Sequence, residues 1–243
     1  MRNQDLPTAM YQTSDVLHMV DAQTVPVMLL CSMALVGNYI FWIENLRLGF
    51  RHKTYSMPIG CLLFFLPHDG TFVVMYHHGF HDIHHWFAEL WWCGLSVTVC
   101  MELTFLVMLL KYGRAEVAPN ASQALFTGMV LLGLVLCTIV WLVLKSVMND
   151  DLFLVIFGIT IFWCAPFNLA LMARRRATVG QSRLAWIGFL MMPVFYWPAT
   201  FILAPGFRAP LWIALGVAAI IGGLLNLIYI NYLDNETKKS VAF

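Results

Sequence analysis

Two carboxylic acids of this chain stand inside long apolar stretches. Asp69 follows His68 in the run CLLFFLPHDGTF, and Glu102 lies in MELTFLVMLL. A charge at the centre of a bilayer costs at least about 2.5–3.5 kcal/mol, so each carboxyl group needs either a hydrogen-bonded structural role or a chemical one. In apolar surroundings a carboxylic acid keeps its proton at neutral pH and can donate it. The sequence therefore indicates proton-donor chemistry, with a structural role as the alternative at both positions.

A second group of reactive side chains is the stretch HHGFHDIHH, with five histidines from His77 to His85. Its last five residues follow the pattern His-x-x-His-His, which is typical of membrane di-iron oxygenases. Such enzymes need roughly eight histidines that converge on iron. The chain has eight histidines, but none follows His85, and His18 and His52 are predicted on opposite sides of the membrane. The oxygenase stays an alternative, and our prediction is that the chain holds no metal.

The elements that must position these residues are membrane helices. The chain is 60% hydrophobic and 11% charged, against roughly 25% charged residues in soluble domains, and its apolar windows approach the ~20 residues that cross a bilayer. We predict an all-α, multi-pass integral membrane protein with one domain, residues 1–243, in a bacterial cytoplasmic membrane or the endoplasmic reticulum. Seven spans are predicted, at about 23–43, 56–78, 86–110, 122–145, 151–173, 184–204 and 209–233.

The distribution of basic residues predicts the orientation of this bundle. The loops after the first, third and fifth spans and the C-terminal tail hold eleven lysines and arginines, and the opposite side holds three. Cytoplasmic loops carry the excess of basic residues. We therefore predict a cytoplasmic C-terminus and an N-terminus outside, with the histidine stretch at the outer surface.

Helical spacing indicates which other side chains could share a site with the acids. Trp91, Thr98 and Glu102 fall on one stripe of the third predicted span. Further polar and aromatic candidates for substrate contact are Asn38, Tyr39, Trp42, Tyr196, Trp197, Tyr229 and, at a cavity mouth, His77. Each has a structural alternative, as an interhelical hydrogen bond or an interfacial aromatic. The chemical interpretation is an aromatic cavity that stabilises a positive charge without offering a nucleophile.

Three segments resemble a known family. The stretch RLGFRHKTYSMP, followed by CLLFFLPHDGTF, resembles the membrane-bound terpene cyclases of fungal meroterpenoid and indole-diterpene pathways and their bacterial relatives. MELTFLVMLLKYGR and the Gly-Gln-Ser at 180–182 are similar to two further family segments. The catalytic glutamate of the family falls on Asp69 and its tryptophan on His68, and Glu102 stands where the family usually has aspartate. Asn226, in LNLIYINYLD, replaces the second catalytic acid of the family.

The resemblance implies a proton-initiated, metal-independent cyclase without a cofactor. Asp69 would protonate a terminal alkene or epoxide of a prenyl chain, with His68 or Glu102 tuning or reprotonating it and Asn226 as an uncharged polar group near the same cavity. The implied partners are a prenylated small molecule and membrane lipid, with neither nucleic acid nor an obligate protein partner. A seven-span transporter or receptor, in which Asp69 and Glu102 relay protons, is the alternative from another class.

Overall fold

The computed structural model describes residues 10–241, and their side chains to residue 236. Within this part of the chain every regular element is a helix, and no strand occurs. The elements are α1 (Thr13–Ala22), α2 (Thr24–His52), α3 (Ile59–Val74), the π-helix η1 (His78–Ile83), α4 (Trp86–Tyr112), α5 (Arg114–Val117), α6 (Gln123–Met148), α7 (Leu154–Arg175), α8 (Arg183–Leu203), the 3₁₀-helix η2 (Pro205–Arg208) and α9 (Pro210–Val241).

The length of these helices supports a multi-pass membrane protein. Six of them, α2, α4, α6, α7, α8 and α9, are long and apolar enough to cross a bilayer among the described residues. The second predicted span is shorter than expected, because α3 has only 16 residues. At 1.5 Å per residue it extends about 24 Å, against a hydrocarbon layer of roughly 30 Å. The structure thus supports six candidate spans and leaves the seven-span count unconfirmed.

The largest difference from the predicted boundaries is at α2, which continues nine residues beyond the predicted end at 43. Glu44 and Arg47 face each other one turn apart as an ion pair of 2.7 Å, so charges that suggested a loop lie on a helix surface. The helix ends at Lys53, whose left-handed backbone conformation lets its N–H bond to the carbonyls of the last turn. The short helix α1 was not predicted at all.

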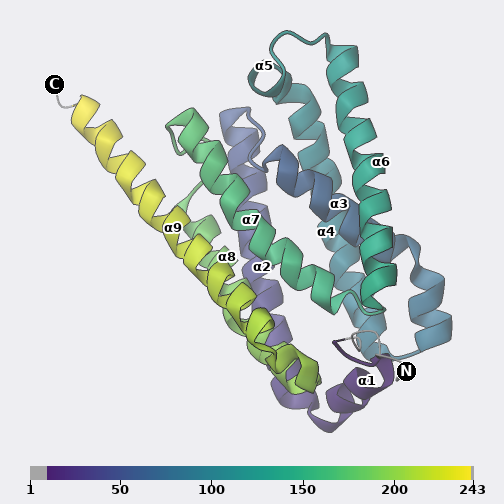
Figure 1. Cartoon of the computed structure of the whole chain (residues 1–243). Coiled ribbons are helices and arrows are strands. Elements are labelled where there is room, and N and C mark those ends of the chain that lie inside the picture. The colour runs from purple at the N-terminus through teal and green to yellow at the C-terminus, as the bar shows by residue number, and fades with distance from the viewer. Residues whose placement is uncertain (1–9, 242–243) are drawn as a thin grey trace, which may run out of the picture.

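Close contact between α2 and α8 forms the centre of the bundle (Figure 1). Two glycines permit it: a Cβ on Gly37 would lie 2.6 Å from the carbonyl oxygen of Gly188, and a Cβ on Gly188 would lie 2.8 Å from that of Gly37. Small residues let helix backbones approach closely in a membrane, where packing replaces the hydrophobic effect as the source of association. This pair therefore fixes α2 against α8.

The remaining helices surround this pair. α3 packs on α4, α6 and α7, and α9 packs on α7 and α8. Figure 1 shows α6 and α9 at opposite edges of the molecule, with α1 across one end. The window of α6 that would lie in the membrane is only 11% buried, so most of this helix faces lipid. The helices that can enclose a site are therefore α2, α3, α4, α7 and α8.

The two ends of the bundle are chemically different. At one end, here called the histidine end, Tyr11 donates to Asp150 at 2.6 Å and His85 contacts Asp21 at 3.3 Å. At the other, here called the arginine end, the loops 53–58, 113–122 and 176–182 meet through Arg175. Loops that the sequence assigned to one side of a membrane therefore lie together.

Candidate active site

Asp69 and Glu102 line the same cavity, in the middle of the bundle. The cavity has a volume of about 30 Å³ and also receives Asn38, Trp42, Phe65 and Thr98. Small-molecule sites typically have apolar walls with a few polar groups, as this cavity does. α2, α3 and α4 thus bring together two acids that are 33 residues apart in the sequence.

Asp69 is held by its sequence neighbour. Nδ1 of His68 lies 2.5 Å from Oδ1 of Asp69. The imidazole is fully buried, and its ring is in edge contact with those of Trp141 and Phe153, at 5.7 and 5.4 Å between centroids. These rings fix the imidazole, and the imidazole fixes one carboxyl oxygen. The side chain of Asp69 keeps 7% of its surface accessible, on the side where the residue lines the cavity.

Glu102 has a different environment. It is completely buried, and neither of its carboxyl oxygens has a hydrogen-bond partner. It shares the cavity with the carboxyl group of Asp69. A buried ionised carboxylate without a partner costs far more free energy than a neutral carboxylic acid, so this environment favours the neutral acid. Two adjacent carboxyl groups in one apolar cavity can hold and exchange a proton.

Aromatic side chains of α2, α3 and α4 surround the two acids. The indole of Trp42 lies 5.6 Å from the ring of Phe65 and 5.3 Å from that of Phe105, between centroids. Its N–H donates to Oδ1 of Asn38, which leaves the indole no free donor on that side. Aromatic faces attract cations without reacting with them. Asn38, Trp42 and Thr98 line the same cavity as the two acids.

The sequence interpretation did not identify the residues with which α7 and α8 line the cavity. Phe157, Thr160, Ile161 and Cys164 line the cavity from α7, and Met192 lines it from α8. The four α7 residues recur at the helical spacing of three and four, which places them on one face. A threonine and a cysteine on such a face were the available signal, but in an apolar helix small polar residues more often serve packing.

Several predicted site residues lie outside this cavity. Asn226 donates to the carbonyls of Ala165 and Gly222, at 3.0 and 2.8 Å, and so links α9 to α7. Tyr229 stacks on Tyr232 of the same helix, with 6.0 Å between centroids. Asn226 thus lies at an interhelical contact, whereas Tyr229 contacts a residue of its own helix.

The remaining predicted aromatics occupy four other places. Trp197 donates to the carbonyl of Trp212 at 2.7 Å. Tyr196 donates to the carbonyl of Leu154 and its ring packs on Phe157, one layer behind the cavity wall. Tyr39 donates to the carbonyl of Gly94 at 3.1 Å, joining α2 to α4. Trp91 lines a neighbouring cavity that is described below.

The histidine stretch covers the histidine end with side chains that point to different partners. His77 is exposed and packs on His81, with 4.5 Å between ring centroids. Nδ1 of His78 lies 3.0 Å from Asp82, and Nε2 of His85 lies 3.3 Å from Asp21. His77 does not line the acid cavity. Among the described residues, no three His, Cys, Asp or Glu side chains come together as potential metal ligands.

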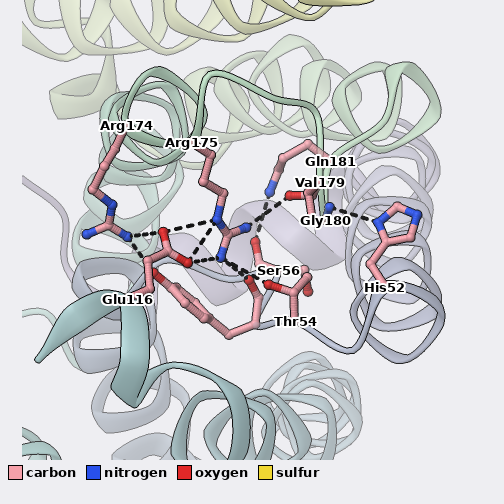
Figure 2. Close-up of polar contacts among 10 residues, drawn as sticks. His52, Thr54, Ser56, Glu116, Arg174, Arg175, Val179, Gly180 and Gln181 are labelled. Atoms are coloured by element: carbon pink, nitrogen blue, oxygen red, sulfur yellow. Dashed lines mark hydrogen bonds and ion pairs between the residues drawn. The ribbon is translucent and has the colours of Figure 1, made fainter. Parts of the chain in front are cut away.

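Two of the segments that carry the family resemblance, 47–58 and 180–182, meet at the arginine end (Figure 2). Arg175 donates to Thr54 Oγ1 at 3.2 Å, to the carbonyl of Tyr55 at 3.0 Å and to Glu116 at 2.8 Å. The N–H of Gly180 donates to Nδ1 of His52 at 3.1 Å. The stretch 47–58 and the loop 180–182 are thus fastened to each other. They position the start of α3, on which Asp69 lies, and do not line the cavity.

Glu116 is the acid at the centre of this cluster. Partial burial favours its protonated form, but hydrogen bonds and charges from Arg175 and Arg174 outweigh burial and lower the pKa of Glu116 below its ordinary value of 4.5. The carboxylate is therefore ionised at neutral pH and joins α5 to the end of α7.

Comparison of the chain with protein-family models, with curated proteins and with solved structures finds no match.

Proposed function

We propose that this protein is an integral membrane terpene cyclase that uses Asp69 as its Brønsted acid. The observation that carries the proposal is the pair of buried carboxyl groups, Asp69 and Glu102, in one cavity with aromatic walls. The motif resemblance adds to it, because the position of the family's catalytic glutamate falls on the residue that lines the cavity.

The proposed reaction begins when Asp69 gives its proton to the terminal alkene or epoxide of a prenyl chain. The π electrons of the chain then close the rings, and the positive charge moves toward a carbon that loses a proton to a base. One proton enters and one leaves, so the product is an isomer of the substrate. Such general acid catalysis typically contributes about 10²–10⁴-fold to a rate.

Each neighbouring group has a part in this proposal. His68 orients Asp69 through Nδ1, which leaves the other carboxyl oxygen free for the substrate. Glu102, without a hydrogen-bond partner, holds the second proton that restores Asp69 after transfer. Trp42 and Phe65 shelter the cation. No cofactor enters the scheme.

We also propose that α3, together with the helical turn after it, completes a seventh crossing, and that the histidine end faces outside. The basic loops at the arginine end support this orientation, because such loops remain in the cytoplasm.

The experiment is incubation of the protein, purified in lipid nanodiscs, with a farnesylated indole in deuterated water. The expected product has more rings than the substrate and the same number of carbon atoms. It carries one deuterium at the carbon that was protonated, as measured by mass spectrometry and NMR. Recovery of unchanged farnesylated and geranylgeranylated substrates, as alkene and as epoxide, would contradict the proposal. Proton flux across proteoliposomes without any isomer would favour the transporter.

A further inference from the structure

A second cavity lies beside the acid cavity, toward the histidine end. It has a volume of about 130 Å³ and is lined by the first half of α2 and of α4, including Ser32, Leu35, Trp91 and Gly94. Asn38 and Phe157 line both cavities, so the two spaces adjoin at these side chains. We call this second space the side chamber.

The side chamber opens sideways, between α2 and α4. Ser32 and Leu90, one on each helix, are exposed on the outer surface of the bundle. α2 packs along α8 far more extensively than along α4. Gly94 lies where the two helices meet, and a Cβ there would make only ordinary contacts, at 3.8 Å from Leu35 and from the hydroxyl of Tyr39. Because this surface is the part of a membrane bundle that faces lipid, the opening leads into the hydrocarbon layer.

The inner wall of the side chamber is aromatic. The ring of Trp91 stacks near that of Phe87, with 6.3 Å between centroids and 18° between planes, and meets Phe157 edge-on at 5.1 Å. The indole N–H of Trp91 is buried and has no acceptor. A buried donor without a partner costs about 1–3 kcal/mol, which a bound acceptor atom would offset.

From these observations we infer that the side chamber binds the aromatic head of a lipid-soluble prenylated substrate, which is admitted from the membrane between α2 and α4. The head packs on Trp91 and accepts its N–H, and the prenyl chain passes Asn38 and Phe157 to reach the acids. Leu95 and Glu102 are seven residues apart on α4, or about 10 Å along the helix. The end of the chain that is farthest from the head thus meets Asp69. The inference rests on the proposed function for the identity of the ligand, but its test measures binding alone.

The experiment is photolabelling in lipid nanodiscs with a farnesylated indole that carries a diazirine on the indole ring. Mass spectrometry of the digested protein should find saturable label in residues 28–35 and 87–95. Gly94→Leu, which fills the opening, should reduce this label at least tenfold. Ser32→Trp closes the same opening from the side of α2. It is the replacement variant if the Gly94→Leu protein does not fold.

Two matched variants control for the substitutions themselves. Gly94→Ala adds only an ordinary contact and should label as the unmodified protein does. Gly128→Leu makes the larger change on the lipid-facing surface of α6, where a Cβ meets nothing within 4 Å, and should also label normally. Label that maps elsewhere, for example to the groove between α3 and α6, or that survives both blocking variants, would overturn the inference.

The N–H of Trp91 has its own control pair. Trp91→Phe keeps an aromatic ring but removes the donor, and should weaken binding of the probe at least fivefold. Trp163→Phe also removes an unpartnered buried N–H, but Trp163 lines neither cavity, so binding should not change. Equal affinity of the two variants would overturn the assigned hydrogen bond. Saturable label in the side chamber of a protein that forms no isomer would sink the cyclase alone, and isomer formation with label elsewhere would sink the side chamber alone.

Discussion

Asp69 and Glu102 line one cavity but differ in their partners: Oδ1 of Asp69 lies 2.5 Å from Nδ1 of His68, whereas neither oxygen of Glu102 has a hydrogen-bond partner. One acid is thus oriented and the other is unconstrained. Substitution of the two acids should therefore have different effects on activity and stability.

Replacing Asp69 with asparagine should abolish isomer formation while leaving the fold intact. The amide has the shape of the acid but cannot donate a proton to an alkene, so the rate should fall at least about 10²-fold. The measurement is product formation per minute, alongside the melting temperature and binding of the probe. Asp82→Asn is the matched control, because Asp82 is exposed at the histidine end and pairs only with His78; it should keep full activity. A folded Asp69→Asn protein with normal turnover would remove Asp69 from the mechanism.

Replacing Glu102 with methionine should make the protein more stable and inactive. The carboxyl group is buried without a partner, and a buried polar group in this state costs about 1–3 kcal/mol in proteins. An apolar side chain of similar length should raise the free energy of unfolding by that amount. Denaturation in one detergent measures it. Glu44→Met is the comparison, since Glu44 bonds to Arg47 and Ser182 and its loss should destabilise. A destabilised Glu102→Met protein would show that the acid has a partner in the fold.

Acid should loosen the arginine end through Glu116. The pKa of this carboxyl is lower in the folded protein than its ordinary value of 4.5, because Arg175 and Arg174 outweigh the effect of burial. The ionised carboxylate of Glu116 therefore stabilises the folded protein fully at pH values above 4.5. This stabilisation is lost as the pH falls through the lower pKa of the folded protein.

Glu116→Gln should therefore melt a few degrees lower than the unmodified protein at pH 7, since about 1 kcal/mol shifts the melting temperature by roughly 2–4 °C at this size. The difference should shrink below about pH 4. Melting curves of both proteins between about pH 4 and pH 7 measure the difference in melting temperature. A difference that does not depend on pH would show that the charge of Glu116 contributes nothing to stability.

Gly180→Ala should destabilise the same end. Gly180 has a φ of +82°, and a Cβ there would lie 3.2 Å from the Cα of Ser56. A left-handed conformation costs a residue with a Cβ roughly 1–2 kcal/mol, before any displacement of the loop 53–58. Gly128→Ala, in the open middle of α6, should instead gain about 0.5–1 kcal/mol. Thermal melts of both variants measure these changes in stability. Equal stability of the two variants would contradict the role of the left-handed turn at Gly180.

The helices of this protein were predictable from its sequence because apolar runs of membrane length are strong signals. The spans of α4, α6, α7 and α8 begin and end within three residues of the predicted bounds. The end of α2 was not predictable in this way, because Glu44 and Arg47 suggest a loop until their ion pair is seen. Likewise α3 is shorter than its apolar run, since the chain changes to a π-helix at His78.

The candidate site, like the helices, was predictable only in part. Asp69, Glu102, Asn38, Trp42 and Thr98 were predictable, because a polar group in an apolar helix must face something other than lipid. The packing partner of each helix was not, so Asn226 and Trp197 were predicted at a site although they join helices. The residues Phe157 to Cys164 were missed for the opposite reason, since nothing in an ordinary apolar stripe says which cavity it faces.

One helix stands apart from all of this. α9 is the longest helix of the described chain, yet it contributes no residue to either cavity, and it meets the rest of the protein through α7 and α8. Evolutionary change in its outward positions can therefore match membranes of different thickness or composition without altering the side chains that line either cavity, whereas a change in the shape of a cavity must come from substitutions in the other helices.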